Sequence, residues 1–250
     1  MGKYTGYLLM TDFDNTLYCK GISEENARAI RAFQEEGGLF ALATGRASTW
    51  IAQFSEQIRP NTLCAVMNGS VICSADGSET VYRQSVGTDF EAITRTILEK
   101  CPELNWVNVF HETDSVCVKQ GEPLPSALFA TPVYKAVFHT PAERSDEYKA
   151  IIRSVAEPHY RVMRSWINGI EVQSANTGKG AALLRIKELL GDRARVAVAV
   201  GDYENDIDLV QAADIGYAVG NAIPALIEIA DRVTVPCSEH AIARIIEELA

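Results

Sequence analysis

Residues 7–17 read YLLMTDFDNTL, and this stretch decides the fold of the 250-residue chain. It opens with four apolar residues, as a strand buried on both faces does, and then runs into the carboxylates of Asp12 and Asp14. Open parallel sheets bind ligands at the carboxyl ends of their strands. We therefore expect a parallel sheet whose first strand delivers these two aspartates to a binding edge.

The rest of the chain repeats this alternation of strand and helix on either side of a different middle segment. Ser23 is typical of a helix N-cap, and Ala27, Ile30 and Phe33 recur on one face of the helix that follows. Similar patterns predict strands at 39–44, 63–67, 196–200, 215–219 and 232–235, and helices at 48–58, 180–190, 205–213, 224–230 and from Ser238 onward. Short links between alternating strands and helices indicate a doubly wound, mostly parallel α/β sheet.

The middle of the chain has another pattern, in which apolar and polar residues alternate. The runs WVNVF, SVCVK, YKAVFHT and YRVMRSW predict half-exposed antiparallel strands, with helices near 89–100 and 143–156. We therefore expect an α/β core of residues 1–82 and 173–250, and an inserted α+β cap domain of residues 83–172 that sets substrate specificity. Short connections between the two would act as hinges.

Composition excludes several classes of partner. The chain has 33 acidic and 23 basic residues and a net charge of −10, so we expect no nucleic-acid partner, and a phosphorylated ligand must be received by a local group of residues. The longest apolar runs are only strand-sized, which predicts no membrane partner. The six cysteines are scattered without a CxxC pair, which favours free thiols in the cytoplasm. The sequence makes no prediction about oligomeric state.

The predicted strand ends gather the residues that carry chemistry. They are Asp12 and Asp14 after the first strand, Thr44-Gly45-Arg46 after the second, and the run from Asp202 to Asp206 after the strand at 196–200, with Lys179 at a predicted helix start. Asp12, Asp14 and Asp202 place three carboxylates at one sheet edge, which favours a hard cation bound through oxygen, and Mg²⁺ suits such ligands. Lys179 would partly neutralise these carboxylates and a phosphoryl group, leaving one carboxylate free to attack phosphorus.

Other groups at this edge are suited to holding phosphate oxygens. They are the hydroxyl of Thr44 and the amides of Gly45 and Asn15. Two carboxylates two residues apart also permit a division of labour, with one as nucleophile and the other as acid and base. Each motif alone has an ordinary structural explanation: DFDNT as a turn cap, TGR as a flexible loop, and GDYENDID as a capped helix start. The prediction depends on their occurring in order, each at a strand end or helix start.

In these motifs the sequence resembles the haloacid dehalogenase-like hydrolases, and most closely the Cof-type phosphatases with a large α/β cap of the C2 type. The matching segments are DFDNTL at 12–17, ATGR at 43–46, NGS at 68–70, GKGAAL at 178–183, GDYENDIDLV at 201–210 and IGYAVGNA at 215–222. The resemblance implies a Rossmann-like core that hydrolyses phosphate esters. The sequence departs from the family pattern at Asn15-Thr16, where many members have Gly-Thr. Asn tolerates the same tight backbone conformation.

The resemblance also implies a role for each matching residue. Asp12 would form a phosphoaspartate, and Asp14 would protonate the leaving alcohol and then activate water. Mg²⁺ would be bound by Asp12, the backbone carbonyl of Asp14, and Asp202. The phosphate-binding residues would be Asn15, Thr44, Gly45, Lys179 and Asn205, with Arg46, Asn68 and Asp206 in support. Dehalogenases of the superfamily lack the second aspartate, so Asp14 disfavours carbon–halogen hydrolysis.

The sequence therefore predicts a cytoplasmic, Mg²⁺-dependent phosphatase that acts on a small phosphorylated metabolite. Sugar phosphates are the most common substrates that the resemblance implies, and pyridoxal phosphate and flavin mononucleotide are further candidates. Two alternatives stay open. One is a phosphomutase or phosphotransferase of the same architecture, and the other is a regulatory protein that binds a phosphorylated metabolite without turning it over.

Overall fold

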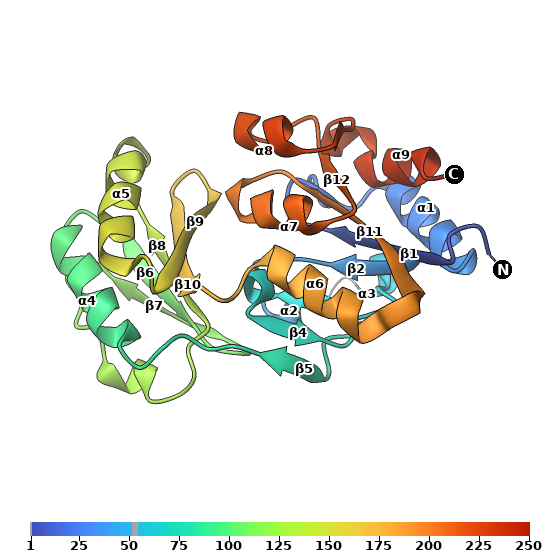
Figure 1. Ribbon diagram of the computed structural model, residues 1–250. Helices are drawn as coiled ribbons and strands as arrows, with labels where there is room; N and C mark the ends of the chain where they lie inside the picture. Colours follow the sequence, from blue (N-terminus) through green and yellow to red (C-terminus); the bar gives the residue numbers. More distant parts are fainter. Residues whose placement is uncertain (1, 52–54) are drawn as a thin grey trace. The chain divides into compact units, whose positions relative to one another are not determined.

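A computed structural model describes residues 2–51 and 55–250 of the chain (Figure 1). The chain divides into two compact units, one formed by Met1–Tyr82 with Gly178–Ala250 and the other by Arg83–Thr177. The first unit is called the core below, and the second is called the cap.

The core is built on a five-stranded parallel sheet in the order β13-β12-β11-β1-β2. Its strands are β1 (Gly6–Thr11), β2 (Leu39–Leu42), β11 (Ala194–Gly201), β12 (Ile215–Ala218) and β13 (Arg232–Val233). β1 and the second half of β11 are almost wholly buried, which explains their nearly continuous apolar sequences. The predicted α/β core with a mostly parallel sheet is confirmed.

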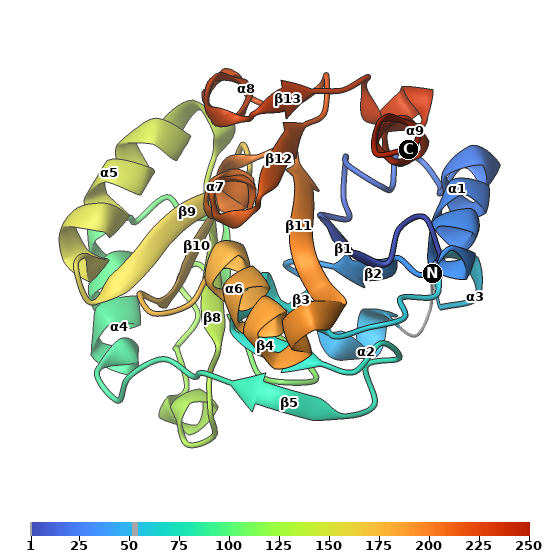
Figure 2. The ribbon, with the colours of Figure 1, turned by 45° about the vertical axis from the view of Figure 1, so that its right-hand side comes forward.

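Helices cover both faces of this sheet. α1 (Glu24–Glu35) and α9 (Ala241–Glu248) pack together on one face, and α6 (Lys179–Leu190) and α7 (Ile207–Ala212) pack together on the other (Figure 2). α8 (Pro224–Ile229) leads into β13. Ser23 caps α1 as predicted, because its Oγ accepts a hydrogen bond from the amide of Asn26 at 3.1 Å. The predicted apolar face of α1 is also confirmed, since Ala27, Ile30 and Phe33 are buried.

The third predicted strand belongs to a separate sheet. β3 (Cys64–Val66), β4 (Val71–Cys73) and β5 (Thr80–Arg83) form a sheet in the order β3-β4-β5, in which β3 and β4 are antiparallel. The strand predicted at 63–67 is therefore present, but it meets the parallel sheet at a parallel bridge between Ala65 and Ala43, the residue after β2, and forms its ladder with β4. The reason is a tight reversal at 67–69, where three successive residues have positive φ and return the chain to pair with β3.

Some predicted elements are shorter in the structure. α2 (Ser48–Ile51) and α3 (Ser55–Ile58) occupy the two ends of the helix predicted at 48–58, and its residues 52–54 lie outside the described residues. The helix predicted at 205–213 is α7, preceded by a 3-10 turn at Glu204–Asp206. The strand predicted at 232–235 contains only the two residues of β13, which pairs with β12 alone at the edge of the sheet.

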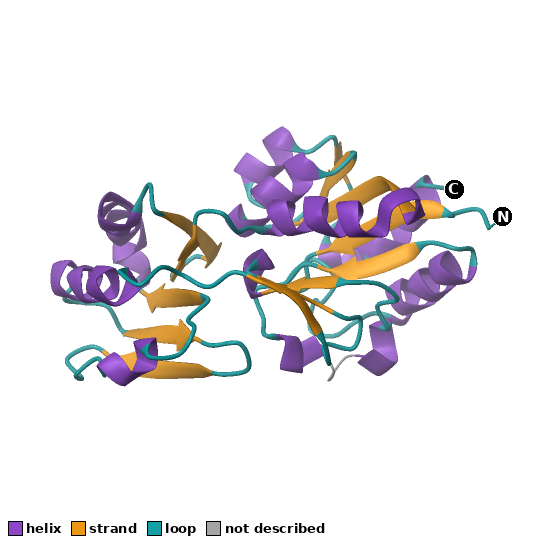
Figure 3. Ribbon diagram, turned by 60° about the horizontal axis from the view of Figure 1, so that its bottom comes forward, coloured by secondary structure: helices purple, strands orange, loops and turns teal. Residues whose placement is uncertain are grey.

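The cap is an α+β unit with its own five-stranded antiparallel sheet in the order β7-β6-β8-β10-β9. Its strands are β6 (Trp106–Phe110), β7 (Ser115–Lys119), β8 (Lys135–His139), β9 (Tyr160–Trp166) and β10 (Gly169–Ser174). Two helices, α4 (Phe90–Lys100) and α5 (Ser145–Ala156), cover one face of this sheet (Figure 3). Their apolar residues, including Phe90, Ile97, Tyr148 and Ile152, form a single buried cluster with the inward residues of the strands.

The compact unit of the cap continues past residue 172, where the sequence places its end. β10 pairs with β9 as far as Ser174, which lies opposite Tyr160. The side-chain amide of Gln173 then donates to the hydroxyl of Thr177 at 2.8 Å, and that hydroxyl donates to the carbonyl of Ser174 at 2.8 Å. These bonds attach residues 173–177 to the cap sheet.

Two further features bear on the expectations from composition. Across residues 2–51 and 55–250, no helix combines the length and the apolar character that crossing a membrane requires. All six cysteines are free thiols, as their scattered spacing predicts.

Candidate active site

The carboxyl ends of β1 and β11 place Asp12 and Asp202 next to each other. The two strands are parallel neighbours, and Thr11 lies opposite Val200 at the end of their ladder. The amide of Asp12 extends the pairing by donating to the carbonyl of Val200 at 2.9 Å. Both aspartates therefore follow directly from strands that end at the same sheet edge, where the sequence places the site.

A third aspartate and a lysine complete a buried charge cluster. Asp12, Asp202 and Asp206 each contribute a carboxylate oxygen, and these oxygens lie within 4.8 Å of one another. The three residues are 6 %, 7 % and 0 % exposed, and Lys179 is fully buried. Its Nζ donates to Oδ1 of Asp12 at 2.5 Å and to Oδ1 of Asp206 at 2.6 Å. Three buried carboxylates thus surround one buried ammonium group.

Burial and mutual repulsion alter the acidity of this cluster. Burial, followed by the charge of Asp206, raises the pKa of Asp12, and Lys179 offsets this only in part. Burial, followed by the charges of Asp12 and Asp206, also raises the pKa of Asp202. Burial alone would lower the pKa of Lys179, but its two carboxylate partners outweigh burial and hold the pKa above its usual range. The lysine therefore stays charged, and the raised pKa values of Asp12 and Asp202 mean that ionising all three carboxylates is unfavourable here unless a cation compensates them.

The cluster fits a hard divalent cation. Its converging atoms are all carboxylate oxygens, the donors that Mg²⁺ prefers. The second oxygen of Asp206 accepts the amides of Asp202 at 2.9 Å and Tyr203 at 3.1 Å, and the hydroxyl of Thr16 donates to Asp202 at 3.4 Å. These bonds orient the carboxylates and leave oxygens of Asp12 and Asp202 directed into the cluster.

Lys179 is positioned by the start of α6. The amide of Gly180 donates to Oδ2 of Asp208 at 3.1 Å, which ties this helix start to α7. Gly69 packs against the residue before the lysine, because a Cβ at Gly69 would lie 2.1 Å from the carbonyl oxygen of Gly178. Gly69 also has a φ of +84°. Glycine is therefore required where the NGS motif meets α6.

The predicted phosphate-binding turn after β2 folds around Thr44. Its buried hydroxyl accepts the amide of Arg46 at 3.2 Å, and Gly45 lies between the two. The carbonyl of Thr44 accepts the amide of Asn68 at 2.9 Å. The side chain of Asn205 in turn donates to Oδ1 of Asn68 at 3.2 Å. Hydrogen bonds thus connect the TGR, NGS and GDYEND motifs.

The amide of Asn15 is not available in the way the sequence predicts. Asn15 adopts a left-handed backbone with a φ of 58°, which its side chain tolerates. Its amide donates to the carbonyl of Tyr18 at 2.9 Å. The tight turn after Asp14 thus uses this amide internally, and the binding of phosphate by Asn15 stays a prediction.

The carboxylate of Asp14 lies outside the acidic cluster. Its Oδ2 accepts Nε of Arg46 at 2.8 Å, and its Oδ1 accepts the terminal nitrogen of Arg46 at 2.6 Å. The expectation that Asp12, Asp14 and Asp202 supply the clustered carboxylates is wrong for this side chain. Asp206 takes the third place, because the turn after β11 directs its carboxylate back toward the strand end.

Three residues that the motifs do not single out also shape the site. Thr16 donates to Asp202, and the side chain of Asn221 donates to the carbonyl of Asn15 at 2.9 Å. Trp50 stacks on the guanidinium of Arg46, with 3.8 Å between that group and the ring centroid. Thr16 and Asn221 fall inside the quoted segments DFDNTL and IGYAVGNA, so those segments held a signal, whereas Trp50 lies outside every motif.

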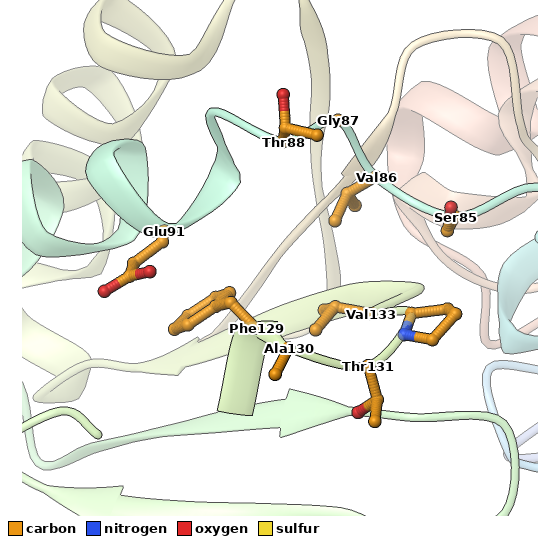
Figure 4. A pocket seen from close by; sticks show the side chains of 10 residues that line it. Ser85, Val86, Gly87, Thr88, Glu91, Phe129, Ala130, Thr131 and Val133 are labelled. Carbon is orange, nitrogen blue, oxygen red and sulfur yellow. The ribbon is translucent and has the colours of Figure 1, made fainter. Parts of the chain in front are cut away.

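A pocket of about 250 Å³ lies within the cap and contains none of the predicted site residues. Figure 4 shows its walls: Ser85 to Thr88 on one side, Phe129 to Val133 on the other, and Glu91 at one end. The two walls are joined by a hydrogen bond from the amide of Val86 to the carbonyl of Val133 at 2.9 Å. This pocket therefore lacks the residues that the sequence predicts for catalysis, and Asp12, Asp202 and Lys179 gather in the core instead.

Comparison with known proteins places this geometry in a family. The sequence profile of the haloacid dehalogenase-like hydrolases matches residues 9–246. A 5-amino-6-(5-phospho-D-ribitylamino)uracil phosphatase of Bacillus subtilis is 27 % identical over 242 residues, which cover 96 % of this chain and 94 % of the relative.

Solved structures share the fold across the whole chain. A haloacid dehalogenase-like hydrolase from B. subtilis superposes with a TM-score of 0.81 at 22 % identity, covering 97 % of this chain and 99 % of its own. A sugar phosphatase of subclass IIB superposes with a TM-score of 0.82 at 19 % identity, covering 97 % of this chain and 98 % of its own.

Proposed function

The chain belongs to the haloacid dehalogenase-like hydrolase family and is a phosphoric monoester hydrolase, and from this premise we propose its mechanism and substrate class. The proposed activity is that of a Mg²⁺-dependent phosphatase, which transfers the phosphoryl group of a small sugar-like phosphate ester to Asp12 and then to water. The observation that supports it best is the buried cluster in which Asp12, Asp202 and Asp206 surround Lys179.

In the first half of the reaction, an oxygen of Asp12 attacks phosphorus and the bond from phosphorus to the leaving oxygen breaks. Lys179 holds the attacking carboxylate through the 2.5 Å bond to its Oδ1, and its charge stabilises the phosphoryl oxygens. Asp14 supplies the proton that the departing alkoxide takes up. The products of this half are the free alcohol and an acyl phosphate on Asp12.

In the second half, water attacks the phosphorus of the acyl phosphate and Asp12 leaves as a carboxylate. Asp14, now ionised, takes the proton from the attacking water, so that the enzyme returns to its starting state. The hydroxyl of Thr44, the amide of Gly45 and the side chain of Asn205 are the groups we assign to the phosphoryl oxygens. Thr44 and Asn205 are buried beside the cluster and linked through Asn68.

Asp12, Asp202 and the backbone carbonyl of Asp14 are the ligands we propose for Mg²⁺. When bound, the ion supplies positive charge that lowers the repulsion between the carboxylates and the phosphate ester. Asp206 stays with Lys179 and with the amides of Asp202 and Tyr203, and so supports the loop that carries Asp202.

The proposed substrate class is a phosphorylated sugar or sugar alcohol. Two relatives from B. subtilis are named as phosphatases of a phosphoribitylamino uracil, and one solved relative in structure is named as a sugar phosphatase. In our proposal the core residues act only on the phosphoryl group, so we assign selection among esters to the cap. A panel of phosphorylated sugars and sugar alcohols, assayed for released phosphate and for isomerised ester, tests this class and separates hydrolysis from mutase activity.

The variant Asp12→Asn tests the mechanism. It removes the nucleophile while keeping the shape of the side chain, so phosphate release should fall to background with Mg²⁺ present. Asp192→Asn is the matched control, because Asp192 is exposed in the 3-10 turn Gly191–Arg193 before β11, and its activity should equal that of the wild type. Circular dichroism confirms that both variants fold. Turnover by Asp12→Asn near the wild-type rate would rule out Asp12 as the nucleophile.

A further inference from the structure

The carboxylate of Asp14 is held by both of its oxygens. Arg46 donates through Nε to Oδ2 at 2.8 Å and through a terminal nitrogen to Oδ1 at 2.6 Å. Such a bidentate pair fixes the plane of the carboxylate as well as its position. The Asp14 side chain is otherwise 47 % exposed, so Arg46 is the contact that sets its orientation.

Arg46 is itself held from two directions. Its guanidinium lies 3.8 Å from the ring centroid of Trp50 and 5.7 Å from that of Phe13, and these two rings meet edge to face with 4.3 Å between centroids. Its backbone is fixed as well, since its amide donates to Thr44 Oγ1 at 3.2 Å and its carbonyl accepts the amide of Met67 at 2.9 Å. The turn after β2 and an aromatic platform thus aim the guanidinium at Asp14.

Stability does not explain this arrangement. The side chains of Arg46 and Asp14 are 38 % and 47 % exposed, and ion pairs this exposed contribute only about 0–1 kcal/mol to folding. The geometry has a clearer consequence for proton transfer. An ionised carboxylate has about four acceptor positions, so a guanidinium that occupies one on each oxygen leaves the others open to a water or to a leaving group.

We propose that Arg46 is a positioning residue for proton transfer, which fixes the carboxylate of Asp14 for its exchange of protons with the leaving group and with water. The inference rests on the proposed function, because it assumes that Asp14 is the acid and base. It assigns to Trp50 the secondary role of holding the guanidinium in place.

Two substrates separate proton transfer from phosphate binding. An alkyl phosphate, such as a sugar phosphate, leaves as a strongly basic alkoxide and needs a proton as the bond breaks. p-Nitrophenyl phosphate leaves as a weakly basic phenolate and does not. A residue that positions the acid therefore affects kcat/KM for the alkyl ester selectively, whereas a residue that binds the phosphoryl group affects both esters equally and raises KM.

The experiment measures kcat and KM of Arg46→Ala and Arg46→Lys on both esters. For Arg46→Ala we expect kcat/KM on the sugar phosphate to fall about 10²-fold, the lower end for general acid catalysis. On p-nitrophenyl phosphate the fall in kcat/KM should be less than about 5-fold, since only proton transfer is impaired. Arg46→Lys keeps the charge without the bidentate fork, so its loss on the sugar phosphate should be intermediate.

Two further variants complete the set. Trp50→Leu removes the ring under the guanidinium and should show the same preference for p-nitrophenyl phosphate, with a smaller loss. Arg28→Ala is the charge-matched control, because Arg28 is an exposed residue of α1 whose side chain is 67 % accessible, and it should behave as the wild type on both esters.

The outcomes distinguish failure of this inference from failure of the proposed function. Equal losses on both esters in Arg46→Ala, with a raised KM, would make Arg46 a phosphate ligand and overturn the inference. Asp14→Asn tests the premise separately. If Asp14→Asn loses kcat/KM mainly on the sugar phosphate while Arg46→Ala does not, the acid role of Asp14 is supported and only the proposed role of Arg46 is overturned. If Asp14→Asn retains full activity on both esters, the proposal that Asp14 is the general acid and base is overturned as well.

Discussion

The chain buries two lysines, one in the core and one in the cap, and their surroundings differ in charge balance. Lys179 in the core is fully buried and bonds to Asp12 and Asp206, with Asp202 in the same cluster. Lys135 in the cap is 2 % exposed and bonds to Glu171 at 2.7 Å, while Ser165 donates to the other oxygen of that glutamate.

This difference separates a structural pair from a reactive site. Lys135 and Glu171 neutralise each other on adjacent strands, and the ring of Phe110 lies 4.8 Å from the ammonium group. Around Lys179 the carboxylates outnumber the ammonium group three to one, which is costly in a buried place unless further positive charge is supplied. The balanced pair needs nothing more, whereas the unbalanced cluster is suited to bind a cation and do chemistry.

Replacing Lys179 should give the largest effect. Lys179→Met removes the charge that holds Asp12 and stabilises the phosphoryl group, so we expect kcat to fall about 10³-fold or more. Steady-state kinetics with saturating Mg²⁺ measures this, and circular dichroism confirms folding. A folded Lys179→Met enzyme with nearly normal kcat would contradict the assignment of this cluster to catalysis.

Replacing Lys135 should lower the free energy of unfolding and leave kcat nearly unchanged. Lys135→Met leaves the buried carboxylate of Glu171 without its cation, and breaking such a pair costs about 3–5 kcal/mol. Urea unfolding measures this loss, and kcat on p-nitrophenyl phosphate should stay near wild type. The double variant Lys135→Met with Glu171→Leu should recover most of the stability, because both charges are removed together. An equal loss in the single and double variants would show that packing, and not charge, explains the cost.

Mg²⁺ should stabilise the core cluster and leave the cap pair unaffected. A ligand present at 100 times its dissociation constant raises the free energy of unfolding by about 2.7 kcal/mol. Thermal unfolding with EDTA and then with Mg²⁺ measures the gain, which Asp202→Asn should largely lose and the Lys135→Met/Glu171→Leu double variant should retain. No gain in the wild type would contradict a metal site at the three aspartates.

The raised pKa of Asp202 should also make the free energy of unfolding depend on pH. Burial and the neighbouring carboxylates raise the pKa of Asp202 above its ordinary value of 3.8. In EDTA the unfolded state therefore loses the Asp202 proton as the pH rises past that value while the folded state keeps it, and the stability of the wild type falls. Asp202→Asn lacks this loss. Its stability relative to the wild type should therefore increase with pH, by up to about 1.4 kcal/mol for each pH unit between about pH 5 and pH 8. A constant difference across this range, measured by urea unfolding, would argue against the raised pKa.

The sequence predicts much of the core because each motif lies at the end of an apolar run. Asp12 and Asp202 follow β1 and β11, and parallel strands necessarily bring their ends to one edge of the sheet. Lys179 opens α6, which packs against α7 and β11 of the core. Local pattern was therefore sufficient to predict which motifs meet.

The sequence does not predict the direction in which each side chain points once the motifs have come together. Asp14 and Asp206 are both near strand ends, yet Asp14 turns outward to Arg46 and Asp206 turns inward to Lys179. Arg46, the partner of Asp14, stacks on Trp50, which lies outside every motif, and Asp206 is held by the amides of Asp202 and Tyr203. The pairing of Lys135 with Glu171 depends on the antiparallel register of β8 and β10, which no local pattern gives.

The central claim is that Asp12 carries the phosphoryl group during turnover. The most direct measurement is acid quenching of the wild-type enzyme in the presence of substrate and Mg²⁺, followed by mass spectrometry of its peptides. The account predicts a phosphoryl adduct on the peptide that contains Asp12, absent from Asp12→Asn and unchanged in Asp192→Asn. Turnover with a phosphoryl adduct on another residue would contradict it. Turnover with no adduct on any peptide would contradict it as well.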